Sequence, residues 1–142
     1  FESGVPVLIV PSAWNKPITS EKVMIAWDGS STAARAVHAA LPALRVATSI
    51  EVVMVAGSKN WSGEPGADVA AYLARHDHKV TVTTLPRSAS EVSTVLLNHA
   101  AESGATMLVM GGYGHNRFRQ FVLGGVTRDM LEKMTIPTLM TH

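Results

Sequence analysis

Cysteine is absent from this sequence of 142 residues, and aromatic residues make up only 6% of it. Without cysteine, the chain can form neither disulfides nor thiolate metal sites, and the composition is compatible with a reducing compartment. The apolar runs are far shorter than the roughly 20 residues that a membrane-spanning helix needs. The first residues also lack the basic start and long apolar stretch of a signal peptide. We therefore expect a cytoplasmic protein that does not enter a membrane.

Neither sign of charge dominates the chain, because 12 basic and 11 acidic residues give a formal net charge of +1. Such a balance creates no basic field, so neither nucleic acid nor an anionic membrane is an expected partner. Hydrophobic residues make up 46% of the sequence and charged residues 16%. A chain of this length and composition can bury a core and fits one compact domain.

Short apolar runs alternate with helix-like stretches along the chain. The predicted strands are residues 23–27, 50–56, 80–83, 106–110 and 138–141. The predicted helices are residues 31–44, 67–75, 90–103 and about 125–134. Repeated strand–helix–strand units predict an α/β fold, with a parallel sheet and helices on both of its faces.

Particular residues refine this prediction. Pro42 lies inside the first helix and is expected to kink or divide it. Residues 80–83 alternate like a half-exposed strand at a sheet edge. His99 falls on the apolar face of its helix, which favours a hydrogen-bonded histidine of the core. His76 and His78 flank Asp77, a pattern more typical of a solvated turn than of a metal site.

A segment punctuated by glycines follows the fourth strand and is the most informative part of the chain. Gly111 and Gly114 stand where the chain leaves that strand, and Gly124 and Gly125 where the next helix is expected to begin. Residues without Cβ let main-chain amides approach a ligand, and the start of a helix favours an anion. The segment therefore predicts a phosphate site, although it contains neither the P-loop motif nor the three-glycine dinucleotide fingerprint.

The spacing Gly111-x2-Gly114-x9-Gly124 resembles the ATP-binding motif of universal stress proteins, G-x2-G-x9-G-[ST]. Asp28 at the end of the first strand and Pro137 before the last one add to the resemblance, which covers about residues 20–142. It implies an open five-stranded parallel sheet in the order 3-2-1-4-5, preceded here by an extra N-terminal strand. Strands one and four are then neighbours, so Asp28 and Gly111 would face one crevice.

The resemblance also implies which residues contact the nucleotide. Ala26 and Asp28 would meet the adenine and ribose, and the backbone at Ala56 or Gly57 the adenine edge. Met110 would pack on the base or ribose. The phosphates would be held by main-chain N–H groups and the Thr127 hydroxyl, in the set Gly111, Gly114, Gly124, Gly125, Val126 and Thr127. The family has Ser or Thr at the position of Gly125, so we expect weakened ATP binding.

The function implied by the resemblance is that of a stress-response module that holds ATP, with Mg²⁺ able to follow the phosphates, and signals through conformation or association. No general base is identifiable, so at most slow hydrolysis is expected. The alternative is a dimerisation domain that binds no nucleotide. Asp28 can also act as a turn-former or helix cap, and His115, Arg117 and Arg119 can neutralise phosphates or merely solvate a loop.

The N-terminus contains an internal repeat. Residues 4–10 resemble residues 135–141: a β-branched residue, a proline and an extended apolar run. We interpret residues 1–11 as the last strand of a preceding copy of the domain, 12–20 as a linker and 21–142 as the nucleotide-binding domain. The other reading is that Val-Pro and Ile-Pro are common ways to enter a strand. We expect residues 5–10 to pair with the last strand, in the same chain or exchanged with a partner in a homodimer.

Overall fold

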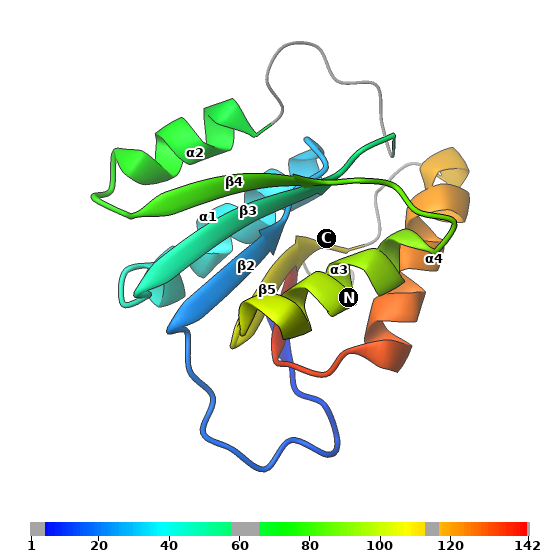
Figure 1. The fold of residues 1–142 in the computed structure, drawn as a ribbon, viewed down its shortest axis with the longest axis horizontal. Helices are drawn as coiled ribbons and strands as arrows, with labels where there is room; N and C mark the ends of the chain where they lie inside the picture. Colours follow the sequence, from blue (N-terminus) through cyan, green and yellow to red (C-terminus); the bar gives the residue numbers. More distant parts are fainter. Residues whose placement is uncertain (1–4, 58–65, 113–116, 142) are drawn as a thin grey trace.

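A computed structural model describes residues 5–57, 66–112 and 117–141, the side chains of 117–124 excepted (Figure 1). The strands are β1 (Val7–Ile9), β2 (Lys22–Ala26), β3 (Ser49–Val55), β4 (Val80–Leu85), β5 (Met107–Gly111) and β6 (Thr138–Thr141). The helices are α1 (Ser31–Leu44), α2 (Ala67–Ala74), α3 (Val92–Ser103) and α4 (Arg117–Lys133). None of the helices in the described ranges is long and apolar enough to cross a membrane.

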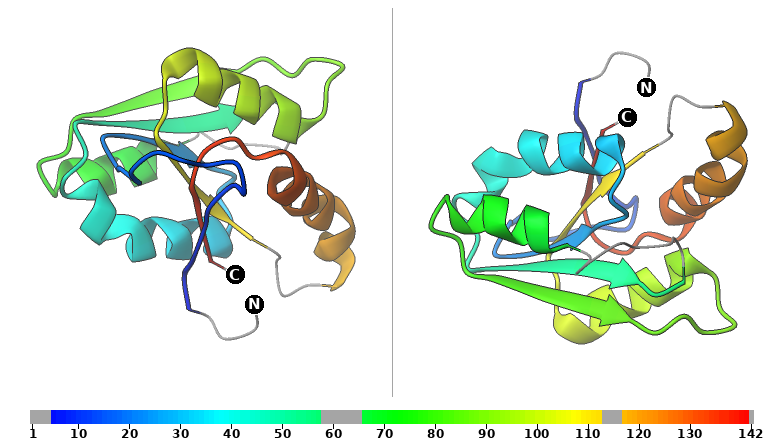
Figure 2. Two further views of the ribbon diagram at one scale, coloured as in Figure 1. Left: turned by 90° about the horizontal axis from the view of Figure 1, so that it is seen from below. Right: turned by 90° about the horizontal axis from the view of Figure 1, so that it is seen from above.

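The strands form one sheet of six in the order β1-β6-β5-β2-β3-β4. Strands β2 to β6 pair in parallel, whereas β1 pairs antiparallel with β6 at one edge, as Figure 2 shows. The predicted α/β class with a mostly parallel sheet is confirmed. Numbered from β2, the parallel strands lie in the order 3-2-1-4-5 from the β4 edge, and β1 adds the sixth strand at the opposite edge.

The core consists of two layers, one on each face of the sheet. Val23 and Ile25 of β2 pack with α1 and α2 on one face. Met24, the residue between them, packs with α3 and α4 on the other. Because successive side chains of a strand point to opposite faces, the nearly continuous apolar run of β2 is what a strand covered on both faces requires. The helices visible in front of and behind the sheet in Figure 1 are these two layers.

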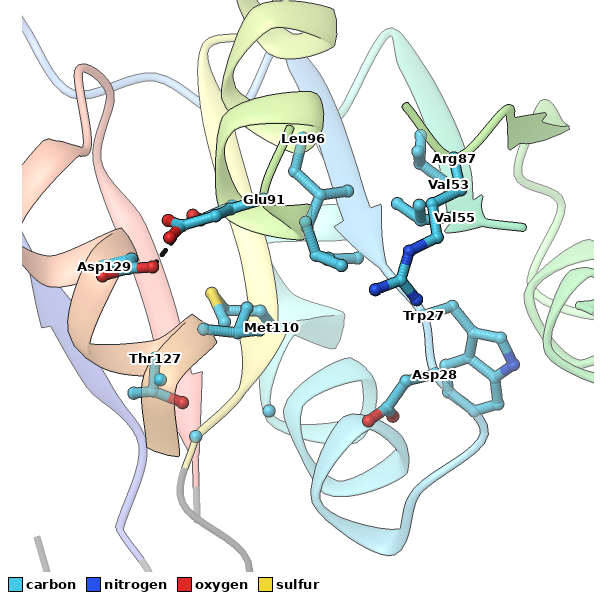
Figure 3. Close-up of a pocket in the computed structure, with 17 residues that line it drawn as sticks. Trp27, Asp28, Val53, Val55, Arg87, Glu91, Leu96, Met110, Thr127 and Asp129 are labelled. Atoms are coloured by element: carbon cyan, nitrogen blue, oxygen red, sulfur yellow. Dashed lines mark hydrogen bonds between the residues drawn. The ribbon is translucent and has the colours of Figure 1, made fainter. Parts of the chain in front are cut away.

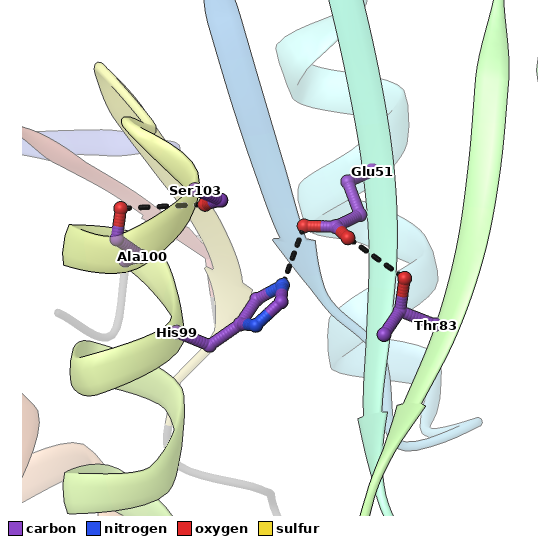
Figure 4. A network of polar contacts seen from close by, with 5 residues as sticks. All are labelled: Glu51, Thr83, His99, Ala100 and Ser103. Carbon is purple, nitrogen blue, oxygen red and sulfur yellow. Dashed lines mark hydrogen bonds and ion pairs between the residues drawn. The ribbon is translucent and has the colours of Figure 1, made fainter.

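The edge position predicted for residues 80–83 is confirmed, and so is the hydrogen bond expected of His99, although His99 is half-buried and not a core residue. Strand β4 lies at the edge of the sheet and is partly exposed along its length. His99 of α3 places Nε2 2.8 Å from Oε1 of Glu51 on β3, and Thr83 on β4 donates its hydroxyl to the other carboxylate oxygen at 2.7 Å (Figure 4). His99 is therefore a hydrogen-bonded residue that ties α3 to the sheet.

The expectation that Pro42 divides the first helix is wrong, because α1 is continuous from Ser31 to Leu44. Proline removes one hydrogen bond in a helix interior, namely the bond from its missing N–H to the carbonyl four residues earlier. Pro42 lies in the last turn, where it leaves the His38 carbonyl without its usual N–H donor, but the helix still continues to Leu44. The N–H of Arg45 still donates to the Leu41 carbonyl at 3.0 Å and closes the helix.

The predicted start of the last helix is also wrong. Helix α4 begins at Arg117 rather than near Gly125, and it runs through Gly124 and Gly125 without a break. A glycine costs a helix interior only about 1 kcal/mol relative to alanine, and it removes no hydrogen bond as proline does. Residues 117–123 include Arg, Gln and Leu, which favour helix. Gly124 and Gly125 therefore lower the helix propensity of the interior of α4 and do not mark its first residue.

Candidate functional site

A pocket of about 350 Å³ opens beyond the carboxyl ends of β2 and β5 (Figure 3). These two strands are hydrogen-bonded neighbours, yet the chain passes through β3 and β4 between them. The pocket thus lies at the switch point of the sheet, where ligands of open α/β folds bind. Its described lining residues are Ala26, Trp27, Asp28, Val53, Val55, Arg87, Glu91, Val92, Ser93, Leu96, Met110, Gly111, Gly112, Gly125, Val126, Thr127 and Asp129.

Asp28 is held in place by the turn that joins β2 to α1. Its Oδ1 accepts a hydrogen bond from the Ser30 N–H at 2.9 Å. Ser30 in turn is the N-cap of α1, since its hydroxyl accepts from the Ala33 N–H at 3.1 Å. The structural and ligand-facing readings of Asp28 are therefore compatible: the carboxylate stabilises the turn and also lines the pocket.

Gly111 ends β5 beside the pocket, but its lack of a side chain serves the packing of α1. A Cβ at this position would lie 2.7 Å from the Ala33 nitrogen and 2.7 Å from the Thr32 hydroxyl oxygen. These distances are too short for any real contact, so β5 can approach the start of α1 only if residue 111 is glycine. Gly111 thus lines the pocket and also lets β5 pack closely against α1, while its contact with a nucleotide remains a prediction.

Helix α4 forms the opposite wall with Gly125, Val126 and Thr127. All three lie well inside the helix, where each N–H donates to the carbonyl four residues earlier. These N–H groups serve α4 in this structure, and the expected main-chain contacts from these residues to a phosphate remain a prediction. Thr127 is a buried residue, with 2% of its surface exposed. A Cβ on Gly125 would meet nothing within 4 Å, and the residue does not adopt the left-handed φ that favours glycine.

The remaining predicted contacts are not brought to the pocket by the described residues. Ala56 and Gly57 follow β3 but do not line it. The Ala56 N–H donates to the Leu85 carbonyl at 2.8 Å, and the Gly57 carbonyl accepts from Arg87 at 3.0 Å. Gly124 lies in α4, and Gly114 lies outside the described residues.

Sequence reasoning missed several polar residues of the pocket. Arg87 follows β4, so the rule that carboxyl ends of parallel strands share one edge could have found it. Glu91 and Ser93 lie at the start of α3, and the Ser93 hydroxyl donates to Asp129 of α4 at 3.4 Å. Glu91 lies 3.5 Å from Lys133 at the end of α4. These contacts bridge α3 and α4 and close that side of the pocket.

The charged groups of the described lining are Asp28, Glu91 and Asp129 against Arg87. Carboxylates accept hydrogen bonds from hydroxyl and amino groups, whereas a guanidinium is suited to phosphate. The described lining thus contains three carboxylates, which can accept hydrogen bonds, and one cationic group, the Arg87 guanidinium. Across the described residues, no three histidine or acidic side chains are close enough together to hold a metal ion.

Comparison with known sequences gives one family. The profile of the Universal stress protein family matches residues 19–142 of this chain. A universal stress protein of Synechocystis is 26% identical over 137 residues, which are 94% of this chain and 46% of the relative. The chain thus spans about half the length of this curated relative.

Comparison with solved structures gives the same fold. A universal stress protein from Archaeoglobus fulgidus has a TM-score of 0.71 at 20% identity. The match covers 99% of this chain and 50% of the Archaeoglobus chain. A family protein from Arabidopsis thaliana, solved with AMP bound, has a TM-score of 0.60 at 16% identity, covering 84% of this chain and 89% of its own. A universal stress protein in complex with cAMP has a TM-score of 0.57 at 18% identity, covering 86% and 97%.

Proposed function

The chain belongs to the universal stress protein family, and we propose that it binds an adenine nucleotide in the pocket between β2, β5 and α4, ATP being the ligand that its glycine spacing favours. One observation carries the proposal. Asp28, Met110 and Thr127 are far apart in the sequence, and the fold brings all three to one pocket at the switch point of the sheet. Two neighbours with this fold were solved with AMP and with cAMP.

The chemistry of the lining fits the base and the sugar. Val53, Val55, Leu96 and Met110 supply an apolar wall against which a planar base can pack. Asp28 offers a carboxylate, which accepts hydrogen bonds from the hydroxyl groups of a ribose or the amino group of adenine. The turn that fixes Asp28 through Ser30 orients this acceptor before a ligand arrives.

The phosphates have fewer described partners. Arg87 and the Thr127 hydroxyl are the donors that suit them, because the N–H groups of Gly125 to Thr127 are used inside α4. Mg²⁺ would be bound largely through phosphate oxygens, since the described residues hold no cluster of three metal-ligating side chains. We propose that the domain is a nucleotide-binding module, in which nucleotide binding to this pocket changes the conformation of the domain or its association with a partner.

Titration calorimetry with ATP, ADP, AMP and cAMP tests the proposal. Asp28→Asn keeps an oxygen for the Ser30 N–H but removes the charge, so the fold is preserved. We expect its affinity for the preferred nucleotide to fall about tenfold, the value of one charge-assisted hydrogen bond. Asp68→Asn makes the same change on the exposed start of α2 and should leave affinity unchanged. Equal affinities for the two variants would contradict the site.

The second candidate is a domain that pairs with another domain and binds no nucleotide. The observation that favours it is the course of α4, which uses the N–H groups of Gly125 to Thr127 within the helix. The same titration separates the candidates. Absence of heat with all four nucleotides at millimolar concentration, from a protein with native circular dichroism, would support the second.

A further inference from the structure

The carboxyl end of the last strand contacts the start of the first helix. Thr141, the final residue of β6, donates its hydroxyl to the carbonyl of Thr32 in the first turn of α1 at 3.1 Å. Both residues are buried, with 3% of Thr141 and 5% of Thr32 exposed. A hydrogen bond between buried groups is costly to leave unmade, so this contact fixes the first turn of α1 against β6.

Two further hydrogen bonds lead from Thr32 to the pocket. The Thr32 hydroxyl oxygen lies 2.9 Å from the hydroxyl oxygen of Ser30. The Ser30 N–H in turn donates to Oδ1 of Asp28 at 2.9 Å, and Asp28 lines the pocket, as Figure 3 shows. Three hydrogen bonds thus connect the end of β6, by way of Thr32 and Ser30, to a carboxylate of the pocket.

Strand β5 confines the side chain of Thr32 from a second direction. Gly111, the last residue of β5, pairs with Thr141 in the neighbouring strand. A Cβ on Gly111 would lie 2.7 Å from the Thr32 hydroxyl oxygen, so this oxygen is in close contact with the backbone of β5. The ends of β5 and β6 together therefore hold Thr32 where its hydroxyl meets that of Ser30.

The turn that carries Asp28 depends on such support. Gly29, the residue between Asp28 and Ser30, has a φ of 74°, a conformation that glycine adopts readily, so the backbone alone restrains the carboxylate weakly. Hydrogen bonds to a carboxylate are directional, and a ligand group meets it well only when the carboxylate is correctly oriented. Binding sites achieve this through residues behind the ligand-contacting ones, whose hydrogen bonds hold them in place.

We propose that Thr141 is a positioning residue of the nucleotide site. Its hydroxyl, acting through Thr32 and Ser30, holds the Asp28 carboxylate in the orientation that binds the ribose or the amino group of adenine. Thr141 itself is not among the residues that line the described pocket, so it acts only through these neighbours. The inference rests on the proposed function for the identity of the ligand.

Titration calorimetry with ATP tests the role of the hydroxyl. Thr141→Val keeps the shape of the side chain without the hydroxyl, and we expect affinity to fall about fivefold, the value of one hydrogen bond. Thr141→Ser restores the hydroxyl and should bind as the parent does. Thr138→Val is the matched control: Thr138 is buried in the same strand and donates to the Ile136 carbonyl at 3.1 Å, so its loss should lower stability but not affinity. Equal affinities of the parent and Thr141→Val would overturn the proposal.

A double-mutant cycle tests whether Thr141 acts through Asp28. In the Asp28→Asn background, the charge whose orientation Thr141 controls is absent. Thr141→Val should therefore cause little further loss of ATP affinity in this background, although it lowers the affinity of the parent. The same loss in both backgrounds would show that the two residues act independently, and it would overturn the proposal.

The amide signal of Ser30 in the nucleotide-free, ¹⁵N-labelled protein separates this inference from the proposed function. Because this N–H donates to Asp28, Thr141→Val should shift the signal, whereas Thr141→Ser and Thr138→Val should leave it in place.

If the parent binds no nucleotide, the proposed function fails, and the Ser30 signal alone decides whether Thr141 positions Asp28. An unchanged Ser30 signal in Thr141→Val would overturn the inference. Should Thr141→Val not fold, Thr32→Val breaks the same connection at the Thr32 hydroxyl and takes its place in every measurement, with the same expected and contradicting results.

Discussion

The pocket is bounded by two strand-to-helix junctions that the chain builds in different ways. Between β2 and α1, four residues make the turn, and Asp28 and Ser30 each satisfy a main-chain N–H near the helix start. Beyond β5, α4 starts at Arg117 and lines the pocket from Gly125 onward. The first junction is fixed by local hydrogen bonds from side chains. The end of β5 at Gly111 is instead fixed by close packing against the start of α1.

This difference explains why the start of α1 could be predicted from the sequence and the start of α4 could not. A serine or aspartate before a helix indicates where the helix begins, because its side chain accepts a hydrogen bond from a specific N–H of the first turn. A glycine shows only that the position has no side chain, and not what this absence serves. At Gly111 the absence serves contact with α1, and at Gly125 it leaves open space. The three predictions that follow test this contrast, beginning with the largest expected effect.

Gly111→Ala should destabilise the protein by about 3 kcal/mol, because overpacking against rigid main chain is among the costlier core changes. The new Cβ would meet the Ala33 nitrogen at 2.7 Å, and a backbone atom cannot move aside as a flexible side chain can. Urea unfolding measures the loss. A variant as stable as the parent would show that β5 and α1 are not in this close contact.

Ser30→Ala should cost about 1 kcal/mol, the usual value of an N-cap side chain. It removes the hydroxyl that accepts from the Ala33 N–H. The matched control is Ser31→Ala, which changes the exposed first residue of α1 and should shift the free energy of unfolding by a few tenths of a kcal/mol or less. If the two variants lose the same stability, the β2–α1 junction is not held by its cap.

Gly125→Ala should stabilise the protein by up to about 1 kcal/mol, since alanine is the better residue in a helix interior. The site has room for the added methyl group and no left-handed φ to resist it. Urea unfolding of this variant, set beside Gly111→Ala, compares one substitution at two glycines of the same pocket. Destabilisation by Gly125→Ala would mean that α4 does not run through residue 125 as described.

Much of the fold follows from the sequence because its causes are local or periodic. The apolar run of β2 lies where its pattern indicates, and α3 ends at Ser103 as expected. The pairing of β1 with β6 was predicted from the repeat and is confirmed for Val7–Ile9. These local and periodic features of the sequence are sufficient to predict the α/β class of fold.

The pocket is less predictable because its residues meet only through tertiary structure. Asp28, Met110 and Thr127 were found through a family motif, and the structure brings them together. Arg87 has no motif and was missed, since its place depends on β4 lying next to β3 and on its bond to the Gly57 carbonyl. Ala56 and Gly57 do not line the described pocket, and their contacts with an adenine edge remain a prediction.

The central claim is that the pocket between β2, β5 and α4 takes an adenine nucleotide. Backbone amide chemical shifts of the ¹⁵N-labelled protein, recorded during titration with ATP and then AMP, test it most directly. We predict saturable shifts at Ala26, Asp28, Met110 and Thr127, with the far end of the sheet near Lys79 unchanged. No shifts at millimolar nucleotide, or shifts confined to residues outside the pocket, would contradict the claim.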